Sequence, residues 1–256
     1  MNAKDFRRKA KESLKGNWLT AVLVGIVASL LGAIGDMGPE VNFEYKGSVP
    51  SVNFAIAGQT LFSTGGSIDS GIGALLAGGA VVLALVSLVL AVITFILGSV
   101  LEIGYGKFNL NLIDRQDIAF DNLFAYFSYW KTALASRFLR FLYVLLWSLL
   151  FVIPGIIADY RYAMTGYILA ENPDMTAGEA IDLSKRLMKG KKWRLFCLRF
   201  SFIGWDILAG LTLGIGYIWL TPYKEAAEAA FYREISGTGH KNEETNWESF
   251  AGNFYE

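Results

Sequence analysis

The sequence has very few of the side chains on which most enzymes and metalloproteins depend. It contains one histidine, His240, and one cysteine, Cys197, so an internal disulfide and a histidine-rich metal site are both excluded. No Ser-His-Asp set, HExxH, CxxC or Walker pattern occurs. We therefore expect no catalytic residues, no bound metal and no cofactor.

Charge is also scarce, and it is evenly balanced. Charged residues make up 18% of the 256 residues, with 23 basic and 23 acidic side chains, so no overall positive field favours nucleic acid as a partner. Hydrophobic residues make up 54% of the chain and aromatic residues 14%. This composition is typical of a protein that is solvated partly by lipid.

The apolar segments predict an all-α fold, a polytopic bundle of about six transmembrane helices arranged as three hairpins. We expect spans at residues 18–34, 74–101, 138–153, 156–171, 195–213 and 217–223, the last of which runs into a surface helix. This threading leaves Lys46 and Arg161 outside and every other lysine and arginine inside, as the positive-inside rule requires. It places the protein in the cell (inner, cytoplasmic) membrane with both termini in the cytoplasm.

The same pattern divides the chain into a membrane domain, a loop and a tail. Residues 1–235 form a single integral membrane domain, residues 35–71 its extracytoplasmic loop, and residues 236–256 a disordered cytoplasmic tail. Within the loop, apolar and polar residues alternate on both sides of Gly47-Ser48, which favours a short β-hairpin. The basic start and first apolar run also match a secretory signal peptide, but no A-x-A cleavage pattern follows.

Basic amphipathic segments precede the first and fifth apolar runs, and we expect them to be helices on the cytoplasmic surface. The first, residues 1–16, carries an apolar stripe of Phe6, Ala10 and Leu14 that should lie on the anionic leaflet. These charges either bind anionic lipid headgroups specifically or only set the orientation of the chain. The candidate lipid-surface residues are Lys185, Arg186, Lys189, Lys191, Lys192, Arg194, Trp18 and Trp193.

The junction between a basic segment and an apolar run is repeated along the chain. SLKGNW at residues 13–18 resembles LMKGKKW at residues 187–193, and YFSYWK at residues 126–131 is a weaker copy. Three copies of a surface helix, a tryptophan and a two-span hairpin would account for six spans. Chance similarity between basic juxtamembrane segments is the alternative explanation.

Asp206 and Arg199 are the charged residues within the apolar stretch from Leu195 to Tyr223, and we treat both as candidate functional residues. A carboxylate at mid-span costs roughly 2.5–3.5 kcal/mol on insertion. Asp206 is therefore either a proton or cation site, or is held by a neighbouring hydroxyl or by Arg199. For Arg199 we expect a snorkelling side chain that reaches the cytoplasmic headgroups.

Several segments together resemble a known family. They are LLWSLLFVIPGII at residues 145–157, YILAENPDMTAGEAIDLSKRLMKGKKWRLF at 167–196, SFIGW at 201–205, LTLGIGYIWLTPY at 211–223 and GYGKFNLNL at 104–112. This set is similar to the bacterial multi-pass membrane proteins grouped as domain of unknown function 975. The resemblance implies an inner-membrane protein of a Gram-positive bacterium, and it supplies no catalytic residues. Asp206 stands where that family is expected to be apolar.

Two functions follow from these observations. The first is a non-enzymatic membrane component that binds lipid, or a partner protein, through its basic surface helices. The second is a small-solute or ion transporter, for which the repeated hairpins and Asp206 are the motivation. An enzyme acting within the membrane ranks third.

Overall fold

A computed structural model gives the fold and describes residues 2–33, 39–46, 49–56, 59–64, 71–116 and 118–237. The first half of the chain forms α1 (Ala3–Leu14), α2 (Trp18–Leu30), β1 (Pro39–Lys46), β2 (Val49–Ile56), β3 (Gln59–Thr64) and α3 (Gly71–Asp114). Two short 3-10 helices follow, η1 (Phe120–Leu123) and η2 (Phe127–Tyr129). The remaining helices are α4 (Trp130–Leu150), α5 (Val152–Tyr162), α6 (Thr165–Glu171), α7 (Ala177–Leu187), α8 (Lys192–Phe200), α9 (Ile203–Leu211) and α10 (Tyr217–Ser236).

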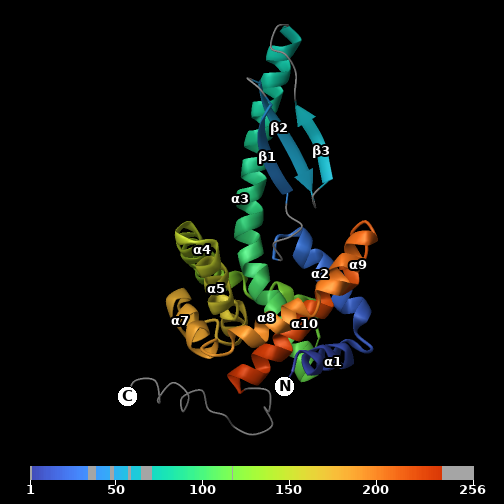
Figure 1. Ribbon diagram of the computed structural model, residues 1–256, viewed down its shortest axis with the longest axis vertical. Coiled ribbons are helices and arrows are strands. Elements are labelled where there is room, and N and C mark those ends of the chain that lie inside the picture. The colour runs from blue at the N-terminus through green and yellow to red at the C-terminus, as the bar shows by residue number, and fades with distance from the viewer. Residues whose placement is uncertain are drawn as a thin grey trace.

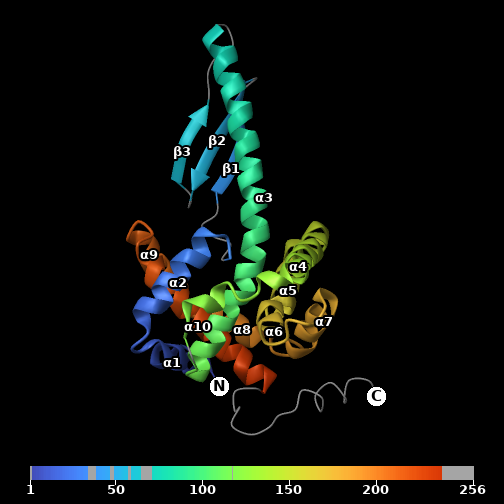
Figure 2. The same ribbon diagram turned by 180° about the vertical axis from the view of Figure 1, so that it is seen from behind.

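Figures 1 and 2 show α3 as a long helix that stands out from the rest of the molecule. The sheet lies beside its N-terminal half, and the other helices gather around its C-terminal half. We call α1, α7, α8 and the C-terminal part of α10 the base, because they lie at the end away from the sheet. From the base, α2, α9 and the α4–α5 hairpin rise toward the sheet and end at a similar height.

Part of the hydrophobic core lies in the base, where α1 packs across α10. Phe6 and Phe231 meet edge to face with ring centroids 5.4 Å apart, and Ala10 and Leu14 are fully buried. The prediction that this apolar stripe lies on a membrane leaflet is therefore wrong. Amphipathic spacing shows which face of a helix is apolar, but not whether lipid or protein covers it. Here the protein's own core does.

The helical body is confirmed, but the prediction of six spans is wrong. Within the described residues, two helical segments are long and apolar enough to cross a membrane, Val89–Asp114 and Phe120–Leu149. They overlap the spans predicted at 74–101 and 138–153. Ala3–Leu14 and Trp18–Leu30 make a third only if this pair, which is bent by 104°, counts as one span.

The other predicted spans fail because their helices are short. Helix α2 has 13 residues, α5 has 11, and α8 and α9 have 9 each. At 1.5 Å per residue these lengths are about 20, 17 and 14 Å, against about 30 Å of hydrocarbon in a bilayer. Hydroxyl groups accompany the breaks: Ser201 Oγ donates to the Leu198 carbonyl at 2.7 Å, and Thr165 Oγ1 donates to the Tyr162 carbonyl at 2.8 Å. Such bonds satisfy carbonyls that a continuous helix would use.

Helix α3 runs further than the sequence suggested. Its uncharged stretch ends at Glu102, yet the helix continues to Asp114 through the buried residues Phe108 and Leu110. Gly104 lets η1 pack closely on this part of the helix, since a Cβ there would overlap the backbone of Leu123. A larger residue would push η1 away from α3.

The sheet is an addition to the predicted all-α class. Strands β1 and β2 pair antiparallel, with Val41 opposite Phe54 and Phe43 opposite Val52, so the predicted hairpin is confirmed. The sequence did not predict β3, which pairs with the other edge of β2. Most of the predicted tail, residues 238–256, lies outside the described residues.

Candidate functional site

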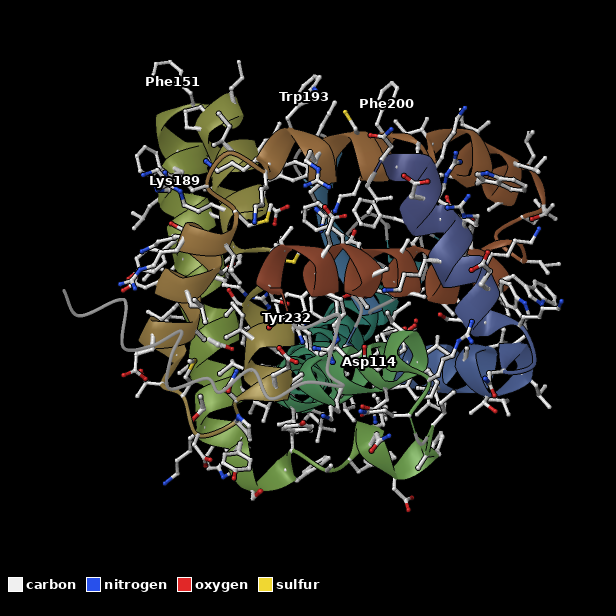
Figure 3. All side chains as sticks on the ribbon, turned by 90° about the horizontal axis from the view of Figure 1, so that it is seen from below. Asp114, Phe151, Lys189, Trp193, Phe200 and Tyr232 are labelled. Atoms are coloured by element: carbon white, nitrogen blue, oxygen red, sulfur yellow. The ribbon has the colours of Figure 1, made fainter. Side chains whose placement is uncertain are left out.

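The basic residues of the α7–α8 corner do not form one site. Arg186 and Lys189 are exposed, and Figure 3 shows Lys189 at the edge of the base. Lys192 is partly buried, and its desolvation, together with the charge of Arg161, lowers its pKa. Two others attach the corner to α10: Lys191 donates to the carbonyl of Ile235 at 3.3 Å and Arg194 to Glu234 at 2.5 Å. Lys185 pairs with Asp182 within α7 at 2.7 Å.

The two candidate tryptophans lie on different surfaces. Trp193 is 71% exposed and stacks on Phe196 with ring centroids 5.0 Å apart, near the exposed Phe200 of the same helix (Figure 3). Trp18, at the start of α2, instead faces Tyr223 of α10 with ring centroids 6.5 Å apart. The candidate lipid-surface residues are therefore divided between two places.

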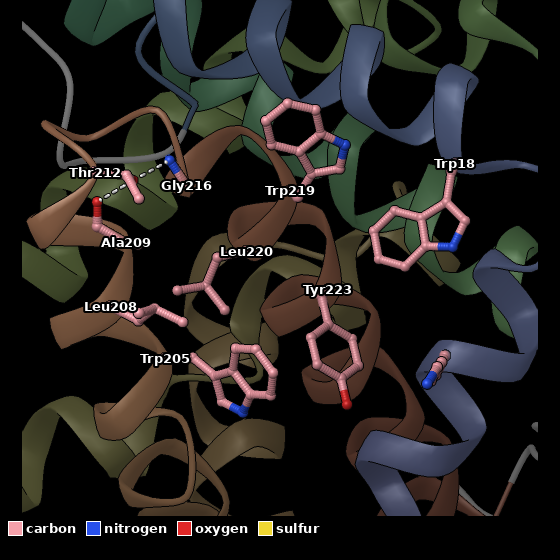
Figure 4. A pocket seen from close by; sticks show the side chains of 10 residues that line it. Trp18, Trp205, Leu208, Ala209, Thr212, Gly216, Trp219, Leu220 and Tyr223 are labelled. Atoms are coloured by element: carbon pink, nitrogen blue, oxygen red, sulfur yellow. Dashed lines mark hydrogen bonds between the residues drawn. The ribbon is translucent and has the colours of Figure 1, made fainter.

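The side chains around Trp18 enclose an apolar pocket of about 390 Å³ between α1, α2, α9 and α10. In Figure 4, Trp18, Trp205, Trp219 and Tyr223 surround this space from three helices. We call it the aromatic pocket. Among the described residues that line it, Lys11 alone carries a charge; the lining is Lys11, Trp18, Trp205, Leu208, Ala209, Thr212, Gly216, Trp219, Leu220 and Tyr223.

Asp206 helps to fix the two helices that build this pocket. The two carboxylate oxygens of Asp206 accept hydrogen bonds from Lys224 Nζ at 3.0 and 3.3 Å, and the Tyr217 hydroxyl donates to the Asp206 carbonyl at 3.2 Å. These contacts fasten α9 to α10 directly beside Trp205. The partner of Asp206 is neither of those expected from the sequence, a hydroxyl or Arg199, because the helices reverse and bring Lys224 alongside.

The chain reverses between α9 and α10, where the sequence predicted one span to end at residue 213 and the next to begin at residue 217. Leu213 and Gly214 both have positive φ, at 54° and 86°, and the Gly216 N–H donates to Thr212 Oγ1 at 2.9 Å (Figure 4). Glycine adopts this left-handed backbone without steric cost. The turn closes one end of the aromatic pocket.

A second cavity, of about 460 Å³, is lined by charged side chains. We call it the charged cavity. The tyrosines Tyr105 and Tyr167 and several small residues complete its wall. Its charged residues come from α3, α4, α5, α8 and α10; they are Glu102, Arg137, Arg140, Asp159, Arg199, Glu225 and Glu228.

Arg199 belongs to this cavity, so the prediction that it snorkels to headgroups is wrong. Its Nε and Nη2 atoms donate to the two oxygens of Glu228 at 2.8 and 3.0 Å, and Nη1 donates to Asp159 at 3.2 Å. A bidentate pair of this kind is stronger than a single hydrogen bond. The neighbouring Glu228 holds the pKa of Arg199 above its ordinary value.

Glu225 has a different environment from Glu228, one helical turn away. It accepts a hydrogen bond from the Tyr167 hydroxyl at 3.2 Å. Burial raises the pKa of Glu225 to about 7, and the charge of Glu228 acts in the same direction. A carboxyl group with this pKa exchanges its proton near neutral pH.

Sequence reasoning missed both cavities. The signal for the aromatic pocket was available, because Trp205 and Trp219 flank the turn that the sequence did predict. The sequence signal for the charged cavity was weaker. Its charged residues lie singly at the borders of apolar runs, where residues such as Arg137 and Glu102 look like ordinary residues at the ends of membrane spans. Among the described residues, no group of three His, Cys, Asp or Glu side chains is arranged to hold a metal ion.

One family model matches the chain, described as Protein of unknown function (DUF975), over residues 148–239. This confirms the resemblance for a segment that runs from the end of α4 to the end of α10. The segment contains Asp206 and Arg199, together with Glu225 and Glu228, but not Arg137. No curated protein and no solved structure matches the chain.

Proposed function

We propose that this chain, whose residues 148–239 match the DUF975 family model, is a membrane-embedded, non-enzymatic component that binds an anionic lipid in the aromatic pocket. The observation that carries the proposal is the lining of that pocket. Three tryptophans, a tyrosine and two leucines form an apolar wall, and Lys11 supplies a single cation. An acyl chain fits the wall, and an anionic headgroup fits Lys11.

Exposed apolar side chains support a membrane environment. Phe151, between α4 and α5, is 73% exposed, and Leu213, between α9 and α10, is 92% exposed. Both turns lie on the side of the base that carries α3 and the sheet (Figures 1 and 2). Large apolar side chains grouped in this way are unfavourable in water and are typical of surfaces covered by lipid.

The basic side chains indicate which side of the membrane the base occupies. Lys4, Arg8 and Lys11 of α1 and Lys15 directly after it are exposed. Arg186 and Lys189 are exposed on the α7–α8 corner. Anionic lipids attract such residues, each contributing about 1 kcal/mol near the surface. The proposed location is therefore a cytoplasmic membrane, with the base and both termini on the cytoplasmic side.

The pocket proposal is tested by lipid retention. The full chain is purified in mild detergent, offered phosphatidylglycerol and phosphatidylcholine in equal amounts, and examined by native mass spectrometry. Lys11→Gln should lose the preference for phosphatidylglycerol, because only the headgroup contact is removed. Trp205→Ala should reduce retention of both lipids, because it removes part of the wall.

Matched controls come from outside the pocket. Lys189→Gln removes an exposed cation of the base, and Trp193→Ala removes an exposed tryptophan of α8. Both variants should retain lipid as the unchanged chain does, because neither residue lines the pocket and in detergent there is no bilayer surface to attract Lys189. The proposal fails if the pocket variants retain lipid normally, or if the controls lose it equally.

The alternative function, a small-solute or ion transporter, is supported by the charged cavity and no longer by Asp206. Asp206 motivated it, but the ion pair with Lys224 gives that carboxylate a structural role. The charged cavity is the feature that favours solute handling. Flux in vesicles reconstituted with the purified chain tests this function directly.

A further inference from the structure

Two ionisable side chains of the charged cavity take no part in its ion pairs. Arg140 pairs with Glu102, and Arg199 pairs with both Glu228 and Asp159. In the part of the chain that the structure describes, neither Arg137 nor Glu225 has an ion-pair partner. The cavity therefore holds one guanidinium and one carboxyl group that form no ion pair with its other described residues.

The surroundings of Arg137 leave hydrogen-bonding capacity unused. Its guanidinium lies over the ring of Phe95 at 5.1 Å, a contact that holds the group without using its N–H donors. Arg137 Nη1 and Arg140 Nε are buried and have no hydrogen-bond partner among the described residues. Buried polar atoms nearly always have partners in folded proteins, so these unused donors beside the cavity are available to a bound ligand.

Glu225 offers the complementary group. From the described residues its carboxyl group accepts one hydrogen bond, donated by Tyr167 of α6, so acceptor capacity is left for a ligand. Burial and the nearby Glu228 raise its pKa to about 7, while Arg199 of α8 opposes this shift and Glu102 of α3 adds to it. A cation placed beside Glu225 would favour the ionised form and release its proton.

We propose that the charged cavity binds a small zwitterion of the α-amino-acid type, with its carboxylate at Arg137 and its ammonium group at Glu225. Arginine recognises a carboxylate through two parallel N–H bonds, and an ammonium group has three donors for carboxylate and tyrosine oxygens. The volume of about 460 Å³ lies within the usual range of small-molecule sites, about 300–1,000 Å³.

Simple ions fit the cavity less well. An anion would meet four carboxyl groups as well as three guanidinium groups, and a cation would leave Arg137 unpaired. A zwitterion satisfies both groups and leaves the net charge unchanged. The cavity is also open to its surroundings, because the Asp159 side chain at its rim is 57% exposed.

The test is thermal unfolding of the full chain in detergent with each of the twenty proteinogenic L-amino acids. At least one of them should raise Tm in a saturable way, since a ligand that binds only the folded state stabilises it. The amide of that amino acid, which lacks the carboxylate, and the corresponding acid without its amino group should not. The proposal is overturned if no amino acid raises Tm, or if either analogue does so equally.

Two substitutions locate the binding. Arg137→Gln and Glu225→Gln should each weaken binding about tenfold or more, because each leaves one buried end of the zwitterion unpaired. Lys189→Gln, on the exposed corner, should bind normally. Normal binding by both cavity variants would overturn the assignment, and if either variant does not fold, the two analogues on the unchanged chain decide the question.

The lipid proposal and this one fail independently. Lys11→Gln and Trp205→Ala should leave amino-acid binding unchanged, because the aromatic pocket and the charged cavity share no lining residue. Proton release gives a second readout. Below about pH 7, calorimetry in buffers of different ionisation enthalpy should detect proton release on binding by the unchanged chain, but not by Glu225→Gln.

Discussion

Arg233 is a buried charged residue, with 4% of its surface exposed. It pairs with Glu171 at the end of α6 and with Asp114 at the end of α3. Glu171 also accepts a hydrogen bond from the Tyr232 hydroxyl at 2.6 Å. One guanidinium thus joins three helices that are far apart in sequence.

Removing Arg233 should destabilise the protein strongly. Arg233→Met leaves Glu171 buried without its cation, which costs about 3–5 kcal/mol in measured cases. The measurement is the free energy of unfolding in detergent. Adding Glu171→Gln to the same chain should recover part of the loss, because the uncompensated charge is then absent.

An exposed pair provides the control for Arg233. Arg8 and Asp5 form an ion pair at 3.4 Å on the surface of α1, with the Arg8 side chain 71% exposed. Arg8→Met should change stability by less than about 1 kcal/mol. Equal effects of Arg8→Met and Arg233→Met would show that the buried network has no special role.

Glu225 should make stability depend on pH near neutrality. Its pKa is raised from 4.5 to about 7 in the folded protein, so the folded state binds its proton more tightly than the unfolded state does. Stability from this group is present below about pH 4.5 and is lost as the pH rises toward about 7, by about 3 kcal/mol at most. Glu225→Gln should flatten this part of the profile of Tm against pH, measured without added solute.

The exposed carboxylate Glu12 of α1 is the matched control for Glu225. Glu12→Gln should leave the slope of Tm between about pH 5 and about pH 8 as it is in the unchanged chain. If Glu225→Gln also leaves the slope unaltered, Glu225 does not titrate in this range.

At the scale of single elements, local sequence signals were reliable. Thr176 and Glu179 have capping-box spacing, and the structure shows both reciprocal hydrogen bonds at the start of α7. Such features depend on residues within one turn of each other. The surface that covers a helix depends on residues far away in the sequence. The apolar face of α1 was therefore assigned to lipid, although Phe231, more than two hundred residues away, packs against it.

The repeated junction has a shared local geometry. Gly16 and Gly190 both have positive φ, at 91° and 75°, and each follows the end of an amphipathic helix. The next helix begins at or beside a tryptophan, Trp18 in α2 and Trp193 in α8. The weaker copy shares only the last feature, since α4 begins at Trp130 without a left-handed glycine before it. The likeness in sequence is therefore also a likeness in backbone for two copies.

The Asp206–Lys224 pair can be tested by exchanging its charges. Asp206→Lys places two cations together and should loosen α9 from α10, with a loss of about 1 kcal/mol or more and weaker lipid retention. Adding Lys224→Asp restores an opposite pair and should restore both properties. Stability and retention of phosphatidylglycerol are the measurements.

The outcome separates two roles for Asp206. A structural ion pair tolerates the exchange, because attraction between α9 and α10 is kept. A proton or cation site requires the carboxylate at position 206, so failure of the double exchange in a folded chain would support a functional role instead.

At the scale of the whole molecule, the lengths of the helices decide how the chain can lie in a membrane. Helix α3 has 44 residues, or about 66 Å at 1.5 Å per residue, and passes well beyond a bilayer core of about 30 Å. Helix α9 has 9 residues and rises only about 14 Å from the base before the chain reverses. If the base lies at the cytoplasmic surface, as proposed, the turn at Leu213 ends inside the hydrocarbon.

Thiol labelling distinguishes a re-entrant hairpin from a crossing one. In a chain carrying Cys197→Ser, the Leu213→Cys thiol should resist a membrane-impermeant maleimide from either side and react once detergent dissolves the bilayer. The Lys189→Cys thiol, on the exposed corner, should react from the cytoplasmic side alone.

Reaction of the Leu213→Cys thiol in intact cells would mean that α8 and α9 cross the membrane together, as the apolar run at 195–213 first indicated. Protection from both sides would mean that the break at Ser201 and Phe202 keeps α8 in the base, and that the aromatic pocket opens toward the inner half of the bilayer, where anionic lipid is within reach of Lys11.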